Sequence, residues 1–554
     1  MRREQGTVAI AGRVISMAGA TDAEAVLITD GTVEAVGDRG ILTQAEHRGI
    51  PIHDFGDRVV LPGFVDPHIH LEHLATGRAR GVDCRVPGCR SIADVLERLF
   101  EALPTAEANG GWLIGYGNLF FDLKLADRRL PTGAELDSVS RTVPIVLHCG
   151  GHVSVLNTRA LELAKVERFL HGAPGLWGSP VVEVDRSGRP TGLVAEINNS
   201  LPLPALDPES LRKELASTYF DWFTTYGVTT FGEMVDSQSS VEHLDALISN
   251  GQIPARGALY PMAPSMLPIE QAAGWAADYR SAAGSDWLSA RGVKMFSDGG
   301  YSARNAAAKT PYVDEHSLRP GSMGRLNLTH PRLVQAVRLT REHGVQLAVH
   351  ANGERAQDEV VSAVLSAGVD YDGPLIRIEH AGNFVSDRSR LSSWRQANIL
   401  PSLQPEFLYN FIGDFLPVVL GGGGTKGRMP LRTLLEEGIV PAASSDVAIG
   451  AEDELSNPLF SIWCCVERKS FFGRTIEISE RLTVSEALRL HTIEAARALG
   501  QEDRLGSLEP GKLGDVVVLD RDPRTVPSEE IRDVLVDAVY VAGQQVHARE
   551  KVGS

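Results

Sequence analysis

The middle of the chain alternates short apolar runs with segments of helical periodicity, and this alternation limits the fold more than any other feature. Parallel strands need a crossover between them, usually a helix, so such an alternation indicates a parallel sheet covered by helices. Segments 331–343 and 355–368 show the helical spacing clearly. The apolar runs are 59–65, 143–147, 228–231, 293–296, 345–349, 375–378, 399–403 and 440–444. Eight such runs predict an α/β fold of the (β/α)8 TIM-barrel type.

The two ends of the chain resemble each other and differ from the middle. Residues 7–17 and 25–37 predict strands with a hairpin turn at Asp30-Gly31. Residues 514–520 and 534–543 have the same strand-like texture near the C-terminus. Because neither end has enough strands to be stable alone, we expect a small β-sandwich domain built from both termini. Two separate terminal hairpins are the alternative.

These patterns set the expected domain boundaries. Residues 1–60 and 491–554 are predicted to form the β-sandwich, and residues 61–490 the barrel. The stretch from about 110 to 200 is long for one barrel connection, so we expect an inserted, lid-like segment there. The full length of 554 residues accommodates a barrel with these additions.

Composition and charge exclude several classes of function. A formal net charge of −17 would repel phosphate backbones and anionic lipids, so no nucleic-acid or membrane partner is expected. Gly12 and Arg13 interrupt the first apolar run before it could form a signal-peptide core, and no uncharged apolar stretch of ~18 residues occurs. Five cysteines are too few for a disulfide scaffold and predict reduced thiols. We therefore expect a soluble, cytoplasmic protein, with a homodimer among the open oligomeric states.

The segment LPGFVDPHIH at residues 61–70 carries the strongest chemical signal. His68 and His70 are two positions apart, so on a strand both imidazoles point to the same side. Two imidazoles at the carboxyl end of a barrel strand make half of a metal site. An HxH pair alone is weak evidence, because such pairs arise often by chance, and it gains weight here from its place after an apolar run.

Further candidate ligands recur in or after later apolar runs. They are Lys294 in VKMFSDGG, His350 in LAVHANGE, His380 in RIEHAGN and Asp446 in ASSDVAIG. Barrel enzymes place their catalytic groups at these strand ends. A single histidine would more often be structural, but the ordered set predicts a metal centre.

Taken together, these motifs resemble the amidohydrolase superfamily over nearly the whole chain. The matching segments are LPGFVDPHIH, the strand ends at His350 and His380, SSD at 444–446 and LGSLEPGKLGDVVVLD at 505–520. Within the superfamily the chain resembles the amidohydrolase family 3 branch, which contains N-substituted formamide deformylases. The segments that match this branch are HCGGHVSVLN from His148, TGLVAE at 191–196, GVTT at 227–230 and VKMFSDGG followed by Arg304. The resemblance implies a metal-bearing barrel plus a β-sandwich from both termini, in agreement with the patterns above.

The resemblance also implies a ligand set for a divalent metal. His68 and His70 correspond to ligands of a first ion, which Asp446 also contacts, and His350 and His380 correspond to ligands of a second. Lys294 holds the place where many relatives carry a carboxylated lysine that bridges two ions. An unmodified lysine in contact with substrate or a carboxylate is the alternative. Zinc is the first choice for imidazole and carboxylate ligands, as one or two ions, with iron, manganese and cobalt as alternatives.

Other residues are candidates for the substrate pocket. His152 is expected to orient the substrate or stabilise the developing oxyanion, and Glu196 to accept a hydrogen bond from the substrate or from a histidine. A loop-stabilising role is the alternative for both. Asn157, Tyr116 and Arg304 are further substrate-binding candidates.

The predicted reaction is metal-assisted hydrolysis of a non-peptide carbon–nitrogen bond in a small organic amide. A metal would lower the pKa of a water towards ~7, and Asp446 would take its proton and pass it to the leaving nitrogen. An N-substituted formamide is the first candidate substrate. Many relatives carry Arg-x-Asp-Gly-His where this chain has His-Cys-Gly-Gly-His at 148–152, so substrate recognition is expected to differ. The alternatives are hydrolysis of a cyclic amide, a urea or carbamate, an amidine or an N-acyl compound, and a non-catalytic regulatory relative.

Overall fold

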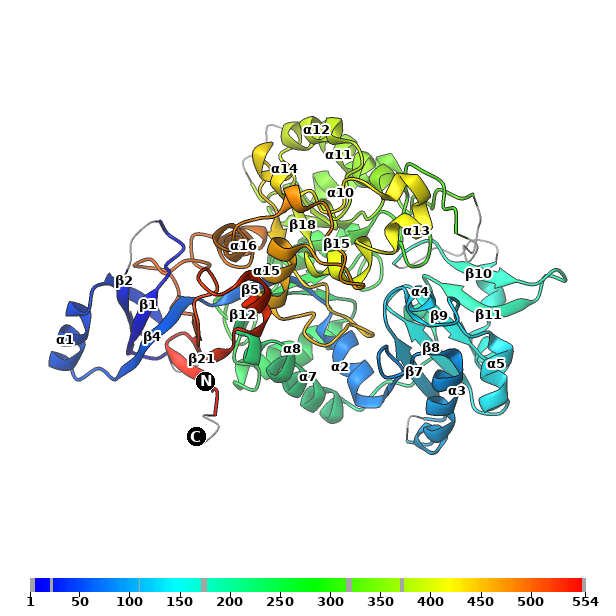
Figure 1. Ribbon diagram of the computed structural model, residues 1–554, viewed down its shortest axis with the longest axis horizontal. Coiled ribbons are helices and arrows are strands. Elements are labelled where there is room, and N and C mark those ends of the chain that lie inside the picture. Colours follow the sequence, from blue (N-terminus) through cyan, green and yellow to red (C-terminus); the bar gives the residue numbers. More distant parts are fainter. Residues whose placement is uncertain are drawn as a thin grey trace.

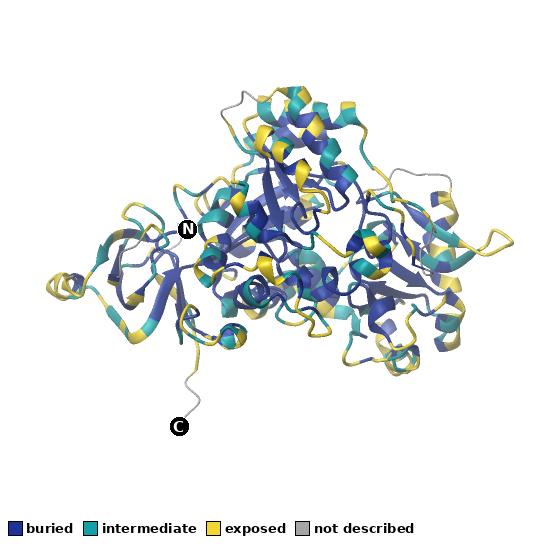
Figure 2. Ribbon diagram, turned by 45° about the horizontal axis from the view of Figure 1, so that its top comes forward, coloured by how far each residue is buried: buried dark blue, intermediate teal, exposed yellow. Residues whose placement is uncertain are grey.

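The computed structural model describes residues 5–19, 23–108, 110–170, 177–314, 321–368 and 373–550. It is an α/β structure with four sheets. The sheet made by the termini and the sheet of the inserted segment lie at opposite ends of the molecule, and two parallel sheets lie between them (Figure 1). Figure 2 shows that the central strands are buried, while the surrounding helices expose their outward faces.

Two parallel sheets form the centre. The first has the order β14 (Leu288–Ala290), β13 (Arg256–Pro261), β12 (Val228–Val235) and β5 (Phe64–Ile69). The second has the order β15 (Gly292–Phe296), β16 (Gln346–His350), β17 (Arg377–Glu379), β18 (Leu400–Leu403) and β19 (Ala442–Ala443). Helices α10 (His330–Glu342) and α11 (Glu354–Ala367) connect β15 to β16 and β16 to β17, as their sequence periodicity predicted.

Backbone contacts join the two parallel sheets at both of their edges. Met262, directly after β13, forms a parallel bridge with Lys294 of β15. At the other edge, the amide of Asp446 after β19 donates to the carbonyl of His68 in β5 at 2.9 Å. These contacts hold the two parallel sheets side by side.

Seven of the eight predicted apolar runs contribute to these central strands. The exception is 143–147, which forms most of β8 (Ile145–Cys149) in the sheet of the inserted segment. The sequence analysis missed β13, whose sequence RGALYP opens with a charged residue and contains Gly257 and Pro261. β13 is buried because β12 and β14 lie on either side of it in the sheet. The composition of so short a segment does not reveal which strands will lie beside it.

Both termini contribute to one seven-stranded sheet. Its order is β22 (Gln544–Ala548), β21 (Val536–Val541), β20 (Val516–Leu519), β4 (Ile52–Pro62), β1 (Val8–Val14), β2 (Ala23–Thr29) and β3 (Thr32–Gly37). The predicted turn at Asp30-Gly31 joins β2 to β3, with φ of 48° and 71° as a type I′ hairpin turn requires. Because β4 and β20 pair directly, the two ends form one unit and not two separate hairpins.

The predicted insertion is a folded unit with a sheet of its own. The strand order is β10 (Val181–Val184), β11 (Pro190–Ala195), β9 (Val153–Leu156), β8, β7 (Leu113–Gly117) and β6 (Val82–Asp83). Helices α3 (Ile92–Glu101) and α5 (Gly133–Val139) pack on one face, and α6 (Thr158–Ala164) packs on the other. The sheet begins at Val82, before the predicted boundary near residue 110.

Among the described residues, the helices are too short or too polar for any of them to cross a membrane.

A buried ion pair ties the terminal sheet to the central strands. Arg256 at the start of β13 donates through Nε and Nη2 to the two carboxylate oxygens of Asp515, at 2.6 and 2.8 Å. Both side chains are almost fully buried. Asp515 also accepts from the backbone amide of Ala542, so one carboxylate holds strands from both units.

Replacing Asp515 should therefore destabilise the protein strongly. Asp515→Ala leaves the Arg256 guanidinium buried without its counter-charge, and we expect a loss of about 3–5 kcal/mol. Differential scanning calorimetry would show it as a lower onset temperature of unfolding. Asp54→Ala, which removes the exposed partner of Arg39, is the control and should leave the onset nearly unchanged. Equal onsets for the two variants would contradict the assigned role.

Candidate metal centre

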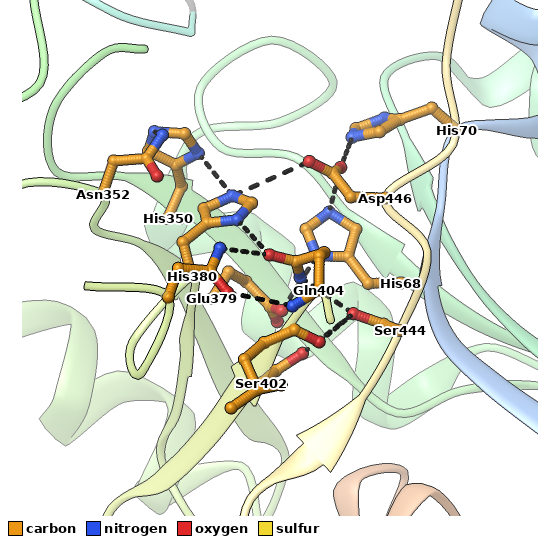
Figure 3. A network of polar contacts seen from close by, with 12 residues as sticks. His68, His70, His350, Asn352, Glu379, His380, Ser402, Gln404, Ser444 and Asp446 are labelled. Carbon is orange, nitrogen blue, oxygen red and sulfur yellow. Dashed lines mark hydrogen bonds and ion pairs between the residues drawn. The ribbon is translucent and has the colours of Figure 1, made fainter. Parts of the chain in front are cut away.

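Three predicted ligands meet where β5 and β19 end. His68 lies in β5, His70 follows it, and Asp446 follows β19. Their ligand atoms all lie within 4.8 Å of one another. Both imidazoles face the Asp446 carboxylate (Figure 3). His68 Nε2 is 3.3 Å and His70 Nε2 is 3.4 Å from Asp446 Oδ1. The two-residue spacing on the strand brings both imidazoles to the same point, as predicted.

The second predicted histidine pair lies on the other side of Asp446. His350 ends β16 and His380 follows β17, and His380 Nε2 is 3.1 Å from His350 Nδ1. His380 Nε2 is also 4.0 Å from Asp446 Oδ2. The carboxylate of Asp446 thus lies between the two histidine pairs (Figure 3).

Lys294 is fully buried beside the first pair. It projects from β15, and its Nζ lies 3.1 Å from His68 Nε2. Burial lowers the pKa of Lys294 to about 8, because a desolvated ammonium is disfavoured. The neutral amine, which is the form that reacts with carbon dioxide, is therefore accessible near neutral pH.

The chemistry of these side chains fits a divalent metal. Imidazole binds metal only in its neutral form. Burial lowers the pKa of His68 to about 3 and also lowers the pKa of His70, His350 and His380, so all four rings are neutral at physiological pH. Neutral imidazoles converging on a carboxylate are a donor set that zinc and neighbouring first-row metals accept.

Glu379 positions His68, and sequence reasoning missed it. His68 Nδ1 lies 2.8 Å from Glu379 Oε2, and Arg377 Nε donates to the other oxygen of the same carboxylate. All three side chains are fully buried. Burial opposes ionisation of Glu379, but Arg377 and His68 keep its pKa well below the usual range. The ionised carboxylate accepts a hydrogen bond from Nδ1–H and so leaves the Nε2 lone pair of His68 facing the ligand cluster.

Gln404 orients the ring of His380, as Glu379 orients that of His68. Its Oε1 lies 2.7 Å from His380 Nδ1, and its Nε2 donates to Ser444 Oγ at 2.9 Å (Figure 3). The Nδ2 of Asn383 donates to the same Gln404 oxygen at 2.7 Å. These contacts orient the His380 ring, and they come from the three segments that follow β17, β18 and β19.

His152 and Glu196 form a pair at the edge of the site. His152 Nδ1 lies 2.9 Å from Glu196 Oε2, and Glu196 Oε1 accepts from the amide of Gly300 at 2.9 Å. The His152 ring lies near His350, with centroids 5.8 Å apart. Burial opposes the charged form of His152, but Glu196 outweighs it and raises the pKa. His152 borders the cavity described below, whereas Glu196 does not. Of the two predicted partners of Glu196, the substrate and a histidine, the structure therefore shows the histidine.

The ligand cluster opens into a cavity of about 90 Å³. Its other walls are largely aromatic: Phe120, Trp177, Phe296, Tyr301, Phe407 and Phe411. Asn352 and Asn410 add amide groups to this wall. A small organic molecule with an apolar part is the kind of ligand that this lining favours.

Three candidates for substrate binding lie outside this cavity. Asn157 caps α6 and holds the loop before β8, with its amide hydrogen-bonded to Ser140, Val143, Ile145 and Ala160. Tyr116 of β7 lies under the Arg85 guanidinium, 5.6 Å from the ring centroid. Arg304 is buried in ion pairs with Asp122 and Asp314. All three side chains thus make contacts within the protein, and Arg304 lines a separate cavity.

Comparison with protein-family models matches residues 52–547 to the amidohydrolase family. The chain belongs to this family. A protein from Arthrobacter pascens named N-substituted formamide deformylase is 26% identical over 549 residues, which cover 96% of this chain and 96% of that protein. The putative amidohydrolase YtcJ of Bacillus subtilis (strain 168) is 28% identical over 538 residues, which cover 95% and 96% of the two chains.

Solved structures share the fold of this amidohydrolase. An uncharacterized metal-dependent hydrolase from Pyrococcus horikoshii OT3 superposes with a TM-score of 0.72 at 23% identity. The superposition covers 95% of this chain and 99% of that one, so the terminal and inserted parts are included.

Removing the Glu379 carboxylate should weaken metal binding. Glu379→Gln keeps the side-chain size but loses the charge that fixes the His68 ring, and we expect an affinity for Zn²⁺ about 10- to 100-fold lower. Titration against a chelating dye measures this affinity. Glu359→Gln, which changes a carboxylate of α11 paired with His330, is the control and should bind as the unchanged protein does. Equal affinities in all three proteins would show that Glu379 does not support the ligand.

Proposed function

We propose that this protein hydrolyses a non-peptide carbon–nitrogen bond in a small organic amide and depends on a metal to do so. The convergence of His68, His70 and Asp446 beside a mainly aromatic cavity is the observation that carries the proposal. An N-substituted formamide is the first candidate substrate. The similarity to the Arthrobacter pascens protein over nearly the whole length of both chains supports this choice.

The residues of the centre have distinct proposed roles. His68, His70 and Asp446 would hold a divalent metal, with zinc as the first choice, and His350 and His380 would be available to a second ion. When bound, such a metal supplies Lewis acidity and lowers the pKa of water to ~7. Asp446 would accept the proton of the attacking water and return it to the leaving nitrogen, since both transfers occur in sequence at one centre.

His152 would donate to the carbonyl oxygen as negative charge develops there. Its Nδ1 is engaged by Glu196, so Nε2 remains for the substrate. Hydrogen-bond donors aimed at a developing oxyanion act strongly in a water-poor site. The position of His152 between Gly151 and the His350 ring on the cavity wall supports this role.

We also propose that Lys294 is carboxylated. The carbamate would supply two anionic oxygens, and the buried amine lies 3.1 Å from His68 Nε2. We further infer that the two parallel sheets are arcs of one barrel spanning residues 61–490 with the inserted unit. The terminal sheet, from residues 1–60 and 491–554, would form the β-sandwich.

Removing the proton-transfer group should abolish most turnover. In zinc-loaded Asp446→Asn enzyme we expect kcat lower by about 10²- to 10⁴-fold, because the amide side chain cannot accept the proton. Amine and formate release from N-substituted formamides would measure it. Asp453→Asn, which changes an exposed carboxylate nearby, should keep the original rate. Unchanged turnover in Asp446→Asn would reject the proposed mechanism.

A substrate panel tests the specific bond. Formamides, acetamides, ureas and lactams should be compared under identical metal loading. Preference for formamides supports the first candidate, and exclusive activity on lactams or ureas would replace it with one of the alternatives named above.

A further inference from the structure

A second cavity of about 220 Å³ adjoins the metal cavity. Three segments of the chain border both. Residues 119–120 line the metal cavity and residues 120–122 the second. Gly150 lines the metal cavity and Cys149 the second, and segment 300–304 passes from one to the other at Ser302. The two cavities therefore share a wall made of Phe120 and Ser302.

Phe120 is held rigidly in this wall. Its ring stacks on Phe411, with centroids 4.9 Å apart and planes 18° apart, and the Arg304 guanidinium lies 5.5 Å from its centroid. Its φ of 55° is in the left-handed region, which is unusual for a bulky residue. Strained backbone of this kind persists where the surroundings impose it, and it occurs often at ligand sites.

Ser302 adds a hydroxyl that lacks a protein partner. The residue is only 7% exposed, yet its Oγ makes no hydrogen bond within the described part of the chain. Native proteins pair nearly all buried polar groups, so an unpaired one on a cavity wall points to a ligand or ordered water. Its position places that contact where the two cavities meet.

The lining of the second cavity indicates what it would accept. Apolar side chains, among them Phe121, Leu130 and Leu193, form much of the wall. The arginines on it are neutralised, because Arg304 pairs with Asp122 and Asp314, and Arg129 makes a bidentate pair with Glu135. A guest group with a negative charge would find no unpaired arginine there.

The second cavity also has a carboxylate on its wall, that of Glu183. Glu183 of β10 contacts only a hydroxyl, that of Thr191, among the interactions of the described residues. Its carboxylate oxygens can accept further hydrogen bonds. A donor such as a hydroxyl group on the guest would satisfy it, while the apolar walls would hold the rest of the guest.

We propose that the second cavity binds the nitrogen substituent of the substrate, which reaches it past Phe120 and Ser302. This inference rests on the proposed amide hydrolysis. The smaller metal cavity would take the acyl group and the nitrogen. The substrate is then an amide whose nitrogen carries an extended, mainly apolar chain that bears no negative charge and has a hydrogen-bond donor near its far end.

A homologous series of N-alkylformamides, from ethyl to octyl, tests the assignment. For the zinc-loaded enzyme we expect kcat/KM to rise roughly four-fold per methylene, the value for burying one CH₂ group, until the second cavity is filled. Leu193→Trp fills that cavity and should flatten the rise while N-ethylformamide keeps its rate. Leu130→Trp is a second blocking variant in case the first does not fold. Val184→Trp, on the exposed face of β10, is the control and should keep the rise.

The proposed contact between Glu183 and a hydrogen-bond donor on the substrate is tested with ω-hydroxyalkyl formamides of the same lengths. The unchanged enzyme should prefer the hydroxylated chain at the length that reaches Glu183, and Glu183→Gln should reduce this preference. A flat response to chain length, or a rise that persists in both blocking variants, would overturn the inference while leaving amide hydrolysis intact.

A binding measurement separates the two proposals. If none of the formamides is hydrolysed, the proposed function fails, and the same series is titrated calorimetrically into Asp446→Asn protein. Affinity that grows with chain length and is lost in Leu193→Trp would still support the second cavity as a binding site. Affinity independent of chain length would overturn it.

Discussion

The hydrogen bond from the Asp446 amide to the His68 carbonyl is the contact on which the site depends. It links the first and the last of the central strands, which are separated by most of the chain. Since both residues are also candidate ligands, this backbone bond fixes the spacing of a carboxylate and an imidazole. The site is thus assembled by the same contact that joins the edges of the two parallel sheets.

Burial of the candidate ligands sets their charge state. The centre gathers four histidines, a lysine and an aspartate in a buried space, and burial keeps the histidines neutral. The surrounding charges are held in pairs, such as Glu379 with Arg377. The four imidazoles are therefore ready to bind a metal without prior loss of protons near neutral pH.

The sequence allowed much of this to be predicted, for identifiable reasons. His68, His70, His350, His380 and Asp446 each follow an apolar run, and the parallel-strand pattern puts such positions on one edge. Glu379 and Gln404 escaped prediction because their roles depend on which ring lies opposite, which no local pattern records. Asn157 caps α6 and does not line the metal cavity, a difference that its sequence context does not reveal. β13 was missed because its burial comes from its neighbours.

The junction between the consecutive strands β4 and β5 affects the order in which parts of the molecule can fold. Only Gly63 separates the two strands, and a Cβ there would lie 2.2 Å from Thr229 Oγ1, so the junction is tightly packed. β4 in turn pairs with β20, near the end of the chain. On its other side β4 pairs with β1, so the strand that leads into His68 gains its second neighbour only after residues 516–519 have been made. Folding of the terminal sheet and placement of His68 are thereby coupled through segments that lie far apart in the chain.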